Sequence, residues 1–171
     1  MHNFYRALFF IGTSEDNSSE INRTLIVSNK MSIMFGVLTM PLLCLFNISG
    51  YRLQGSLIVL LSLGFFFCVF LNYIKFHIVS KFLLVLISNI AIYFYSSILG
   101  EDVGIQSLYF GMFCLPLVLF DASTVWIRRF LMAVPVFLSI YYEIFGSFGF
   151  KILPLQKDVS LVSFFLVHII T

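Results

Sequence analysis

Six stretches of this chain contain almost no charged residues, and their lengths limit what the chain can fold into. The stretches cover residues 31–51, 53–74, 82–100, 103–120, 130–150 and 159–171, and Glu143 is the one charged residue inside them. The first five have 18 to 22 residues, and a helix that crosses the hydrocarbon core needs about 20. A helix pairs its backbone N–H and C=O groups internally, which a chain in lipid requires. The sequence therefore predicts five membrane-spanning helices.

Composition agrees with a lipid environment. The chain is 60% hydrophobic and 11% charged, whereas soluble domains have about 25% charged residues. The alternating pattern of a membrane β-strand is absent. A formal net charge of +2 without a basic cluster argues against a nucleic-acid partner. The three cysteines lie in apolar runs without C-x-x-C spacing, so we expect neither a disulfide nor a metal site.

The sixth stretch, residues 159–171, differs from the others. Its 13 residues span about 20 Å as a helix, less than the roughly 30 Å core. We interpret it as a truncated sixth helix; the alternative is a complete protein with a half-inserted tail. The expected fold class is all-α, a polytopic membrane helix bundle over residues 31–171 with five complete transmembrane helices plus a truncated sixth. Residues 1–30 are expected to form a cytoplasmic polar N-terminal arm.

Basic residues predict the orientation. One face of the expected bundle carries seven of the ten Lys and Arg residues and the other carries three. The positive-inside rule places the richer face, which includes the N-terminus, in the cytoplasm. The seven are Arg6, Arg23, Lys30, Lys75, Lys81, Arg128 and Arg129, and the three are Arg52, Lys151 and Lys157.

Polar side chains at membrane depth are the candidates for a functional site. An ionisable group in the hydrocarbon costs about 2.5–3.5 kcal/mol on insertion scales, so it normally faces the bundle interior. We predict a ligand pocket that opens outward, with Glu143 and His168 as a buried pair and an acidic turn at its mouth. The predicted pocket residues are Glu143, His168, Asn89, Tyr93, Glu101 and Asp102.

These polar residues also have simpler interpretations. Tyrosines near the outer boundary are typical of an aromatic belt, and Ser or Asn can join neighbouring helices. Asn72 and Asn47 lie near helix ends and are interpreted as interfacial caps. Basic residues on the cytoplasmic side are interpreted first as interfacial anchors near anionic headgroups, with a specific lipid site as the alternative. These are Lys75, Lys81, Arg128 and Arg129, beside Trp126.

The sequence contains no G-x-S-x-G, H-E-x-x-H or Walker pattern. We therefore expect no catalytic residues and no cofactor, and the chain by itself is not expected to be an enzyme. The lipid bilayer is the one partner that composition requires.

Four runs of the sequence suggest a family. They are "NRTLIVSNKMSI", "LNYIKFHIVSKFLLVLISNIAIYFYSSILGEDVGIQSLYF", "CLPLVLFDASTVWIRRFLMAVPVF" and "YYEIF". Over residues 20–171 the layout resembles the six-transmembrane-helix N-terminal input module of bacterial sensor histidine kinases and class III nucleotidyl cyclases. The resemblance implies the bacterial inner membrane, a homodimer and a cytoplasmic effector after the sixth helix. No catalytic residue of such an effector is present in this sequence.

The favoured interpretation is a sensory or signal-transducing membrane module. A small-molecule or membrane-borne signal would enter through the outer half of the bundle and leave as a shift of the last helix. A small transporter or half-transporter is the alternative, since proline-broken helices and midplane polar groups are typical of that class. No inverted repeat supports it. A membrane enzyme would need more His or acidic residues at one depth than the sequence has.

Overall fold

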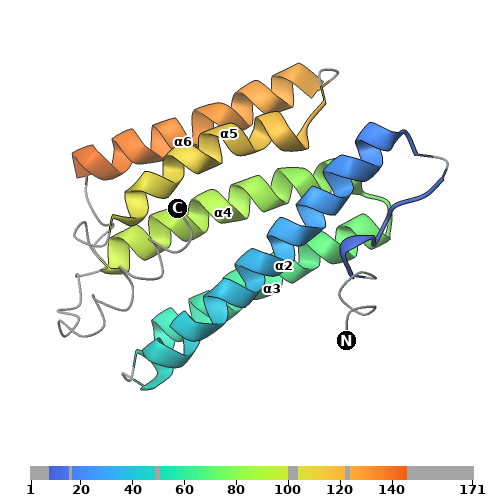
Figure 1. The fold of residues 1–171 in the computed structure, drawn as a ribbon. Coiled ribbons are helices and arrows are strands. Elements are labelled where there is room, and N and C mark those ends of the chain that lie inside the picture. Colours follow the sequence, from blue (N-terminus) through green and yellow to red (C-terminus); the bar gives the residue numbers. More distant parts are fainter. Residues whose placement is uncertain (1–7, 16, 49–50, 100–103, 122–123, 146–171) are drawn as a thin grey trace. The chain divides into compact units, whose positions relative to one another are not determined.

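The computed structural model describes residues 8–15, 17–48, 51–99, 104–121 and 124–145. The chain divides into two compact units, one formed by residues 1–87 with 118–124 and the other by 88–117 with 125–171. The described residues are 88% helical and contain no strand, which confirms the all-α prediction (Figure 1).

Within the described part of the chain, four helices are long and apolar enough to cross a membrane: α2 (Ser19–Ile48), α3 (Arg52–Tyr73), α4 (His77–Leu99) and α6 (Val125–Phe145). A shorter apolar segment consists of η2 (Ile105–Ser107) and α5 (Leu108–Leu119). Residues 146–171, which include the expected sixth helix, lie outside the described residues. The count of five complete helices and a truncated sixth therefore stays a prediction.

Three helices begin earlier than the charge-free stretches. α2 starts at Ser19 instead of residue 31, α4 at His77 instead of 82, and α6 at Val125 instead of 130. The stretches mark only the part suited to hydrocarbon, whereas helical hydrogen bonding continues into the polar interface. Residues 19–30, expected as part of an arm, thus form the first two fifths of α2. Its 30 residues span about 45 Å, the full thickness of a bilayer with its headgroups.

The first unit is built on the pair α2 and α3, which lie side by side (Figure 1). The core of this unit contains Leu25, Ile58 and Phe65, whose exposed fractions are 0 to 2%. Gly36 allows close packing, because a Cβ there would lie 3.0 Å from the Phe66 ring. The Gly36 carbonyl also accepts a hydrogen bond from Ser62 Oγ at 3.2 Å. A small residue and a hydroxyl together hold two helices close, as is common in membrane bundles.

The second unit contains the last part of α4 together with η2, α5 and α6. Pro116 lies inside α5 and Pro135 inside α6. Each proline removes one backbone donor from its helix and can kink it. The buried face of α6 includes Leu131, Pro135 and Tyr142. α5 and α6 therefore each contain a built-in weak point in their hydrogen-bond ladder.

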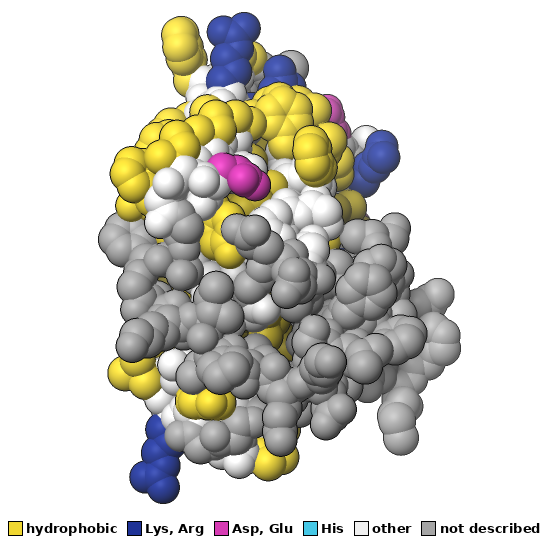
Figure 2. All heavy atoms as spheres, turned by 90° about the vertical axis from the view of Figure 1, so that its left-hand side faces the viewer, with side chains coloured by type: hydrophobic (Ala, Val, Ile, Leu, Met, Phe, Trp, Pro, Cys, Tyr) yellow, Lys and Arg dark blue, Asp and Glu magenta, His cyan; other side chains and the backbone are white. Residues whose placement is uncertain are grey.

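Much of the described surface is apolar. Ile48, Phe110 and Trp126 are each more than 80% exposed. Figure 2 shows an apolar area, drawn in yellow, in the upper part of that face, with Lys and Arg side chains, in dark blue, at its upper and lower edges. Apolar surface of this extent is unusual for a soluble monomer. It is the surface that membrane-spanning helices present to lipid.

Candidate functional site

A hydrogen bond between two helices marks the polar centre of the second unit. Tyr142 Oη, on α6, donates to the backbone carbonyl of Ser96, on α4, at 2.9 Å. The two residues are 3% and 0% exposed. Both residues lie near the C-terminal ends of their helices. A polar contact buried at this depth is a specific link between α4 and α6.

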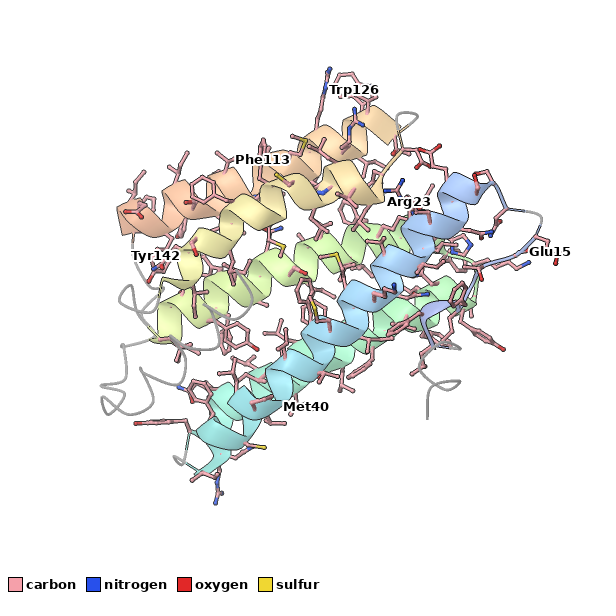
Figure 3. All side chains as sticks on the ribbon, in the orientation of Figure 1. Glu15, Arg23, Met40, Phe113, Trp126 and Tyr142 are labelled. Atoms are coloured by element: carbon pink, nitrogen blue, oxygen red, sulfur yellow. The ribbon has the colours of Figure 1, made fainter. Side chains whose placement is uncertain are left out.

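Tyrosine rings surround this hydrogen bond. The ring of Tyr93 lies 6.0 Å from that of Tyr142, nearly perpendicular to it, and 6.2 Å from that of Tyr141. Tyr109 of α5 is buried, and its phenol is in electrostatic range of Tyr93 and Tyr142. We call Tyr93, Ser96, Tyr109 and Tyr142 the hydroxyl cluster. It gathers side chains from α4, α5 and α6, and Figure 3 shows Tyr142 in this unit.

Two hydroxyls of the cluster have spare hydrogen-bonding capacity. Ser96 Oγ and Tyr109 Oη are buried and have no hydrogen-bond partner among the described residues. By contrast, Ser97 Oγ donates to the Tyr93 carbonyl at 2.8 Å. An unsatisfied buried hydroxyl costs about 1–3 kcal/mol and calls for an explanation. A ligand with a hydroxyl, amide or carboxylate group could bind to these two groups.

The predicted pocket residues have different places in the structure. Tyr93 belongs to the hydroxyl cluster, and Asn89 is fully buried four residues earlier on α4. Glu143 is exposed, because adjacent residues on a helix point about 100° apart and Tyr142 occupies the buried direction. Glu101, Asp102 and His168 lie outside the described residues, so the predicted pair of Glu143 with His168 stays a prediction.

Interpreting the tyrosines as an aromatic belt was wrong for two of them. Tyr109 and Tyr142 are 4% and 3% exposed, whereas a belt residue has its ring at the lipid surface. The sequence signal that could have shown this is the apolar face of α6, on which Leu131, Pro135 and Tyr142 recur at helical spacing.

A second polar network lies in the first unit. Asn72 Nδ2 donates to Asn29 Oδ1 at 2.7 Å and lies 3.5 Å from Ser28 Oγ. All three residues are 0% exposed. The interpretation of Asn72 as an interfacial cap was therefore wrong: its amide joins α3 to α2. The pairing satisfies Asn29 Oδ1 and the Asn72 amide group, which would otherwise be costly in an apolar core, whereas Asn72 Oδ1 has no hydrogen-bond partner among the described residues.

The same network holds the segment before α2. Asn29 Nδ2 donates to the carbonyls of Ile11 at 2.8 Å and of Phe9 at 3.2 Å. Gly12 has φ +80°, and a Cβ there would lie 2.4 Å from the Asn72 carbonyl oxygen. Glycine adopts this left-handed conformation without strain. Part of the expected polar arm thus packs on the end of α3, an arrangement that the sequence interpretation missed.

Lys81 is buried as well. It is 5% exposed, and its Nζ donates to Thr24 Oγ1 at 2.6 Å, joining α4 to α2. Asp121 and Glu20 are the acidic groups that act on it electrostatically. The interpretation of Lys81 as an anchor among headgroups was wrong. Its neighbour Ser80 donates to the Cys68 carbonyl at 2.7 Å, which links α4 to α3.

No group of three or more His, Cys, Asp or Glu side chains that could hold a metal ion occurs among the described residues. Comparison of the chain with protein-family models, with curated proteins and with solved structures found no match. The geometry of the two polar networks is therefore the basis for a functional proposal.

Proposed function

We propose that this chain is a sensory membrane module, in which a signal received at the hydroxyl cluster is passed along α6 toward the cytoplasmic side. The observation that carries the proposal is the Tyr142–Ser96 hydrogen bond beside buried hydroxyls that lack partners. A ligand that binds Ser96 Oγ or Tyr109 Oη competes with this contact or reinforces it. It would therefore have different affinities for two arrangements of α6, which a conformational switch requires.

Pro135 supports the second step of the proposal. It lies inside α6, between the cluster at Tyr142 and the basic end at Arg128 and Arg129. A proline within a helix removes one hydrogen bond and lets the two halves change their mutual angle. A change at Tyr142 can thus move the helix end that carries Trp126. The effector, the homodimer and the inner-membrane location rest on the resemblance to sensor input modules.

Tyr142→Phe tests whether the cluster controls α6 as a whole. The substitution removes the hydroxyl that donates to Ser96 and keeps the ring. In lipid nanodiscs, we expect hydrogen–deuterium exchange to change both near residue 142 and at residues 125–130, beyond Pro135. Tyr73→Phe, which removes an exposed hydroxyl from α3, should change neither region.

Exchange that changes only within one turn of Tyr142 would contradict the proposal, because the hydrogen bond would then affect only its own turn of α6.

The coding sequence after the Thr171 codon gives an independent test. A kinase or cyclase region in frame supports the sensor, whereas further hydrophobic helices support the transporter.

A further inference from the structure

The second unit has an open groove that the proposed sensor function does not use. Its volume is about 460 Å³. Phe113 of α5 lines one side, and α6 contributes the rest: Arg129, Met132, Ala133, Val136, Phe137 and Ile140. The α6 residues follow helical spacing of three or four, so they form one continuous stripe. All lining side chains except Arg129 are apolar.

The charge in the groove is at one end. Arg129 is exposed. Its guanidinium lies 6.0 Å from the ring centre of Trp126. Trp beside Arg is typical of the membrane–water boundary, and a guanidinium binds phosphate through paired hydrogen bonds. Phe113 and Trp126 are labelled in Figure 3.

The length of the groove matches one leaflet of a bilayer. Arg129 to Ile140 is eleven helical steps, about 16 Å along α6, and half of the roughly 30 Å hydrocarbon core is about 15 Å. A lipid tail needs only this half, with its headgroup at the end that carries Arg129.

We propose that the groove binds one acyl chain of an anionic phospholipid, whose phosphate lies against Arg129. The site is distinct from the hydroxyl cluster, because no residue of that cluster lines the groove. The proposal therefore stands or falls separately from the sensor function.

Trp126 is the single tryptophan of the chain and provides a direct readout. The purified protein is placed in nanodiscs of phosphatidylcholine that contain a small fraction of lipid brominated on the acyl chain near the headgroup. We expect brominated phosphatidylglycerol to quench Trp126 with about fivefold higher apparent affinity than brominated phosphatidylcholine. This is the preference that one basic side chain near the surface supplies. Equal quenching by the two lipids would overturn the proposal.

Two variants with the same change in charge locate the site. Arg129→Gln should abolish the preference for the anionic lipid, whereas Arg128→Gln, which is outside the groove lining, should keep it. An equal loss in both variants would show general surface attraction and contradict a specific site. Ala133→Phe fills the groove and should weaken quenching by both lipids. Unchanged quenching in this variant, with helical circular dichroism retained, would also overturn the proposal. The comparison of the two lipids uses the unmodified protein, so it does not depend on whether a variant folds.

Discussion

The side-chain amide of Asn72 donates to Oδ1 of Asn29 at 2.7 Å, and both residues are fully buried between α3 and α2. Asn29 uses its own amide to hold the carbonyls of Phe9 and Ile11. One chain of contacts therefore runs from α3 through α2 to the segment before it. This arrangement makes the first unit dependent on a few amide groups.

Asn72→Ala should lower the free energy of unfolding by about 1–3 kcal/mol, because it leaves the buried Asn29 Oδ1 without its donor. Unfolding in mixed micelles measures the change. Asn47→Ala is the matched control: Asn47 is exposed and donates to the Leu43 carbonyl within its own helix. We expect its effect to stay below about 0.5 kcal/mol. Equal losses in the two variants would contradict a special role for Asn72.

Gly12→Ala should release the segment before α2. The new Cβ would meet the Asn72 carbonyl oxygen at 2.4 Å in a backbone conformation with φ +80°, which costs roughly 1–2 kcal/mol for a residue with a side chain. We expect faster proteolysis and faster hydrogen exchange at residues 8–15. Gly111→Ala, where a Cβ meets nothing within 4 Å, should leave both rates unchanged. Protection retained in Gly12→Ala would disprove the docking.

Lys81 and Thr24 should respond unequally to substitution. Lys81→Met removes a buried charge and keeps the aliphatic stem, so stability should stay the same or rise. Thr24→Val removes the acceptor that lies 2.6 Å from the ammonium group, and we expect a loss of about 1–3 kcal/mol. In the double variant the Thr24→Val loss should disappear. A larger loss for Lys81→Met than for Thr24→Val would argue against this account.

The orientation predicted from the basic residues can be checked with reporter fusions. A fusion after Lys81 should report the cytoplasmic side, and a fusion after Asp102 the opposite side, because residues 82–99 of α4 lie between them. Fluorescent protein and alkaline phosphatase give opposite signals on the two sides. The same signal from both positions would mean that α4 does not cross the membrane.

The sequence predicted the helical class and the apolar cores of the helices, because lipid forces every backbone group into internal pairing. It predicted the helix starts less well, since the polar residues at Ser19 and His77 continue the same hydrogen-bond ladder beyond the hydrocarbon. A search for charge-free runs treats every lysine at the edge of a run as interfacial. This assumption is wrong for Lys81, because its hydrogen-bond partner Thr24 lies 57 residues away in the sequence and the pairing cannot be read from the run itself.

For the candidate site, composition pointed to Glu143 and the structure points to Tyr142. The two residues are neighbours in sequence but face different directions on α6. Which of them is buried depends on where α4 supplies an acceptor, here the Ser96 carbonyl. That information is tertiary, so the rarity of a charge in an apolar run could not provide it. Asn89 is fully buried on α4, and the part of Asn89 and Tyr93 in a ligand site stays a prediction.

The length of α2 gives this chain a dependence on the thickness of its membrane. Its apolar part, residues 31–48, spans about 27 Å, slightly less than an average bilayer core. A thicker bilayer must thin around α2 or draw Lys30 toward its headgroups by snorkelling. The ammonium group of Lys30 lies 5.6 Å from the ring centre of Phe9. Hydrophobic mismatch at α2 therefore acts directly on Lys30, the residue that contacts Phe9 in the segment before α2.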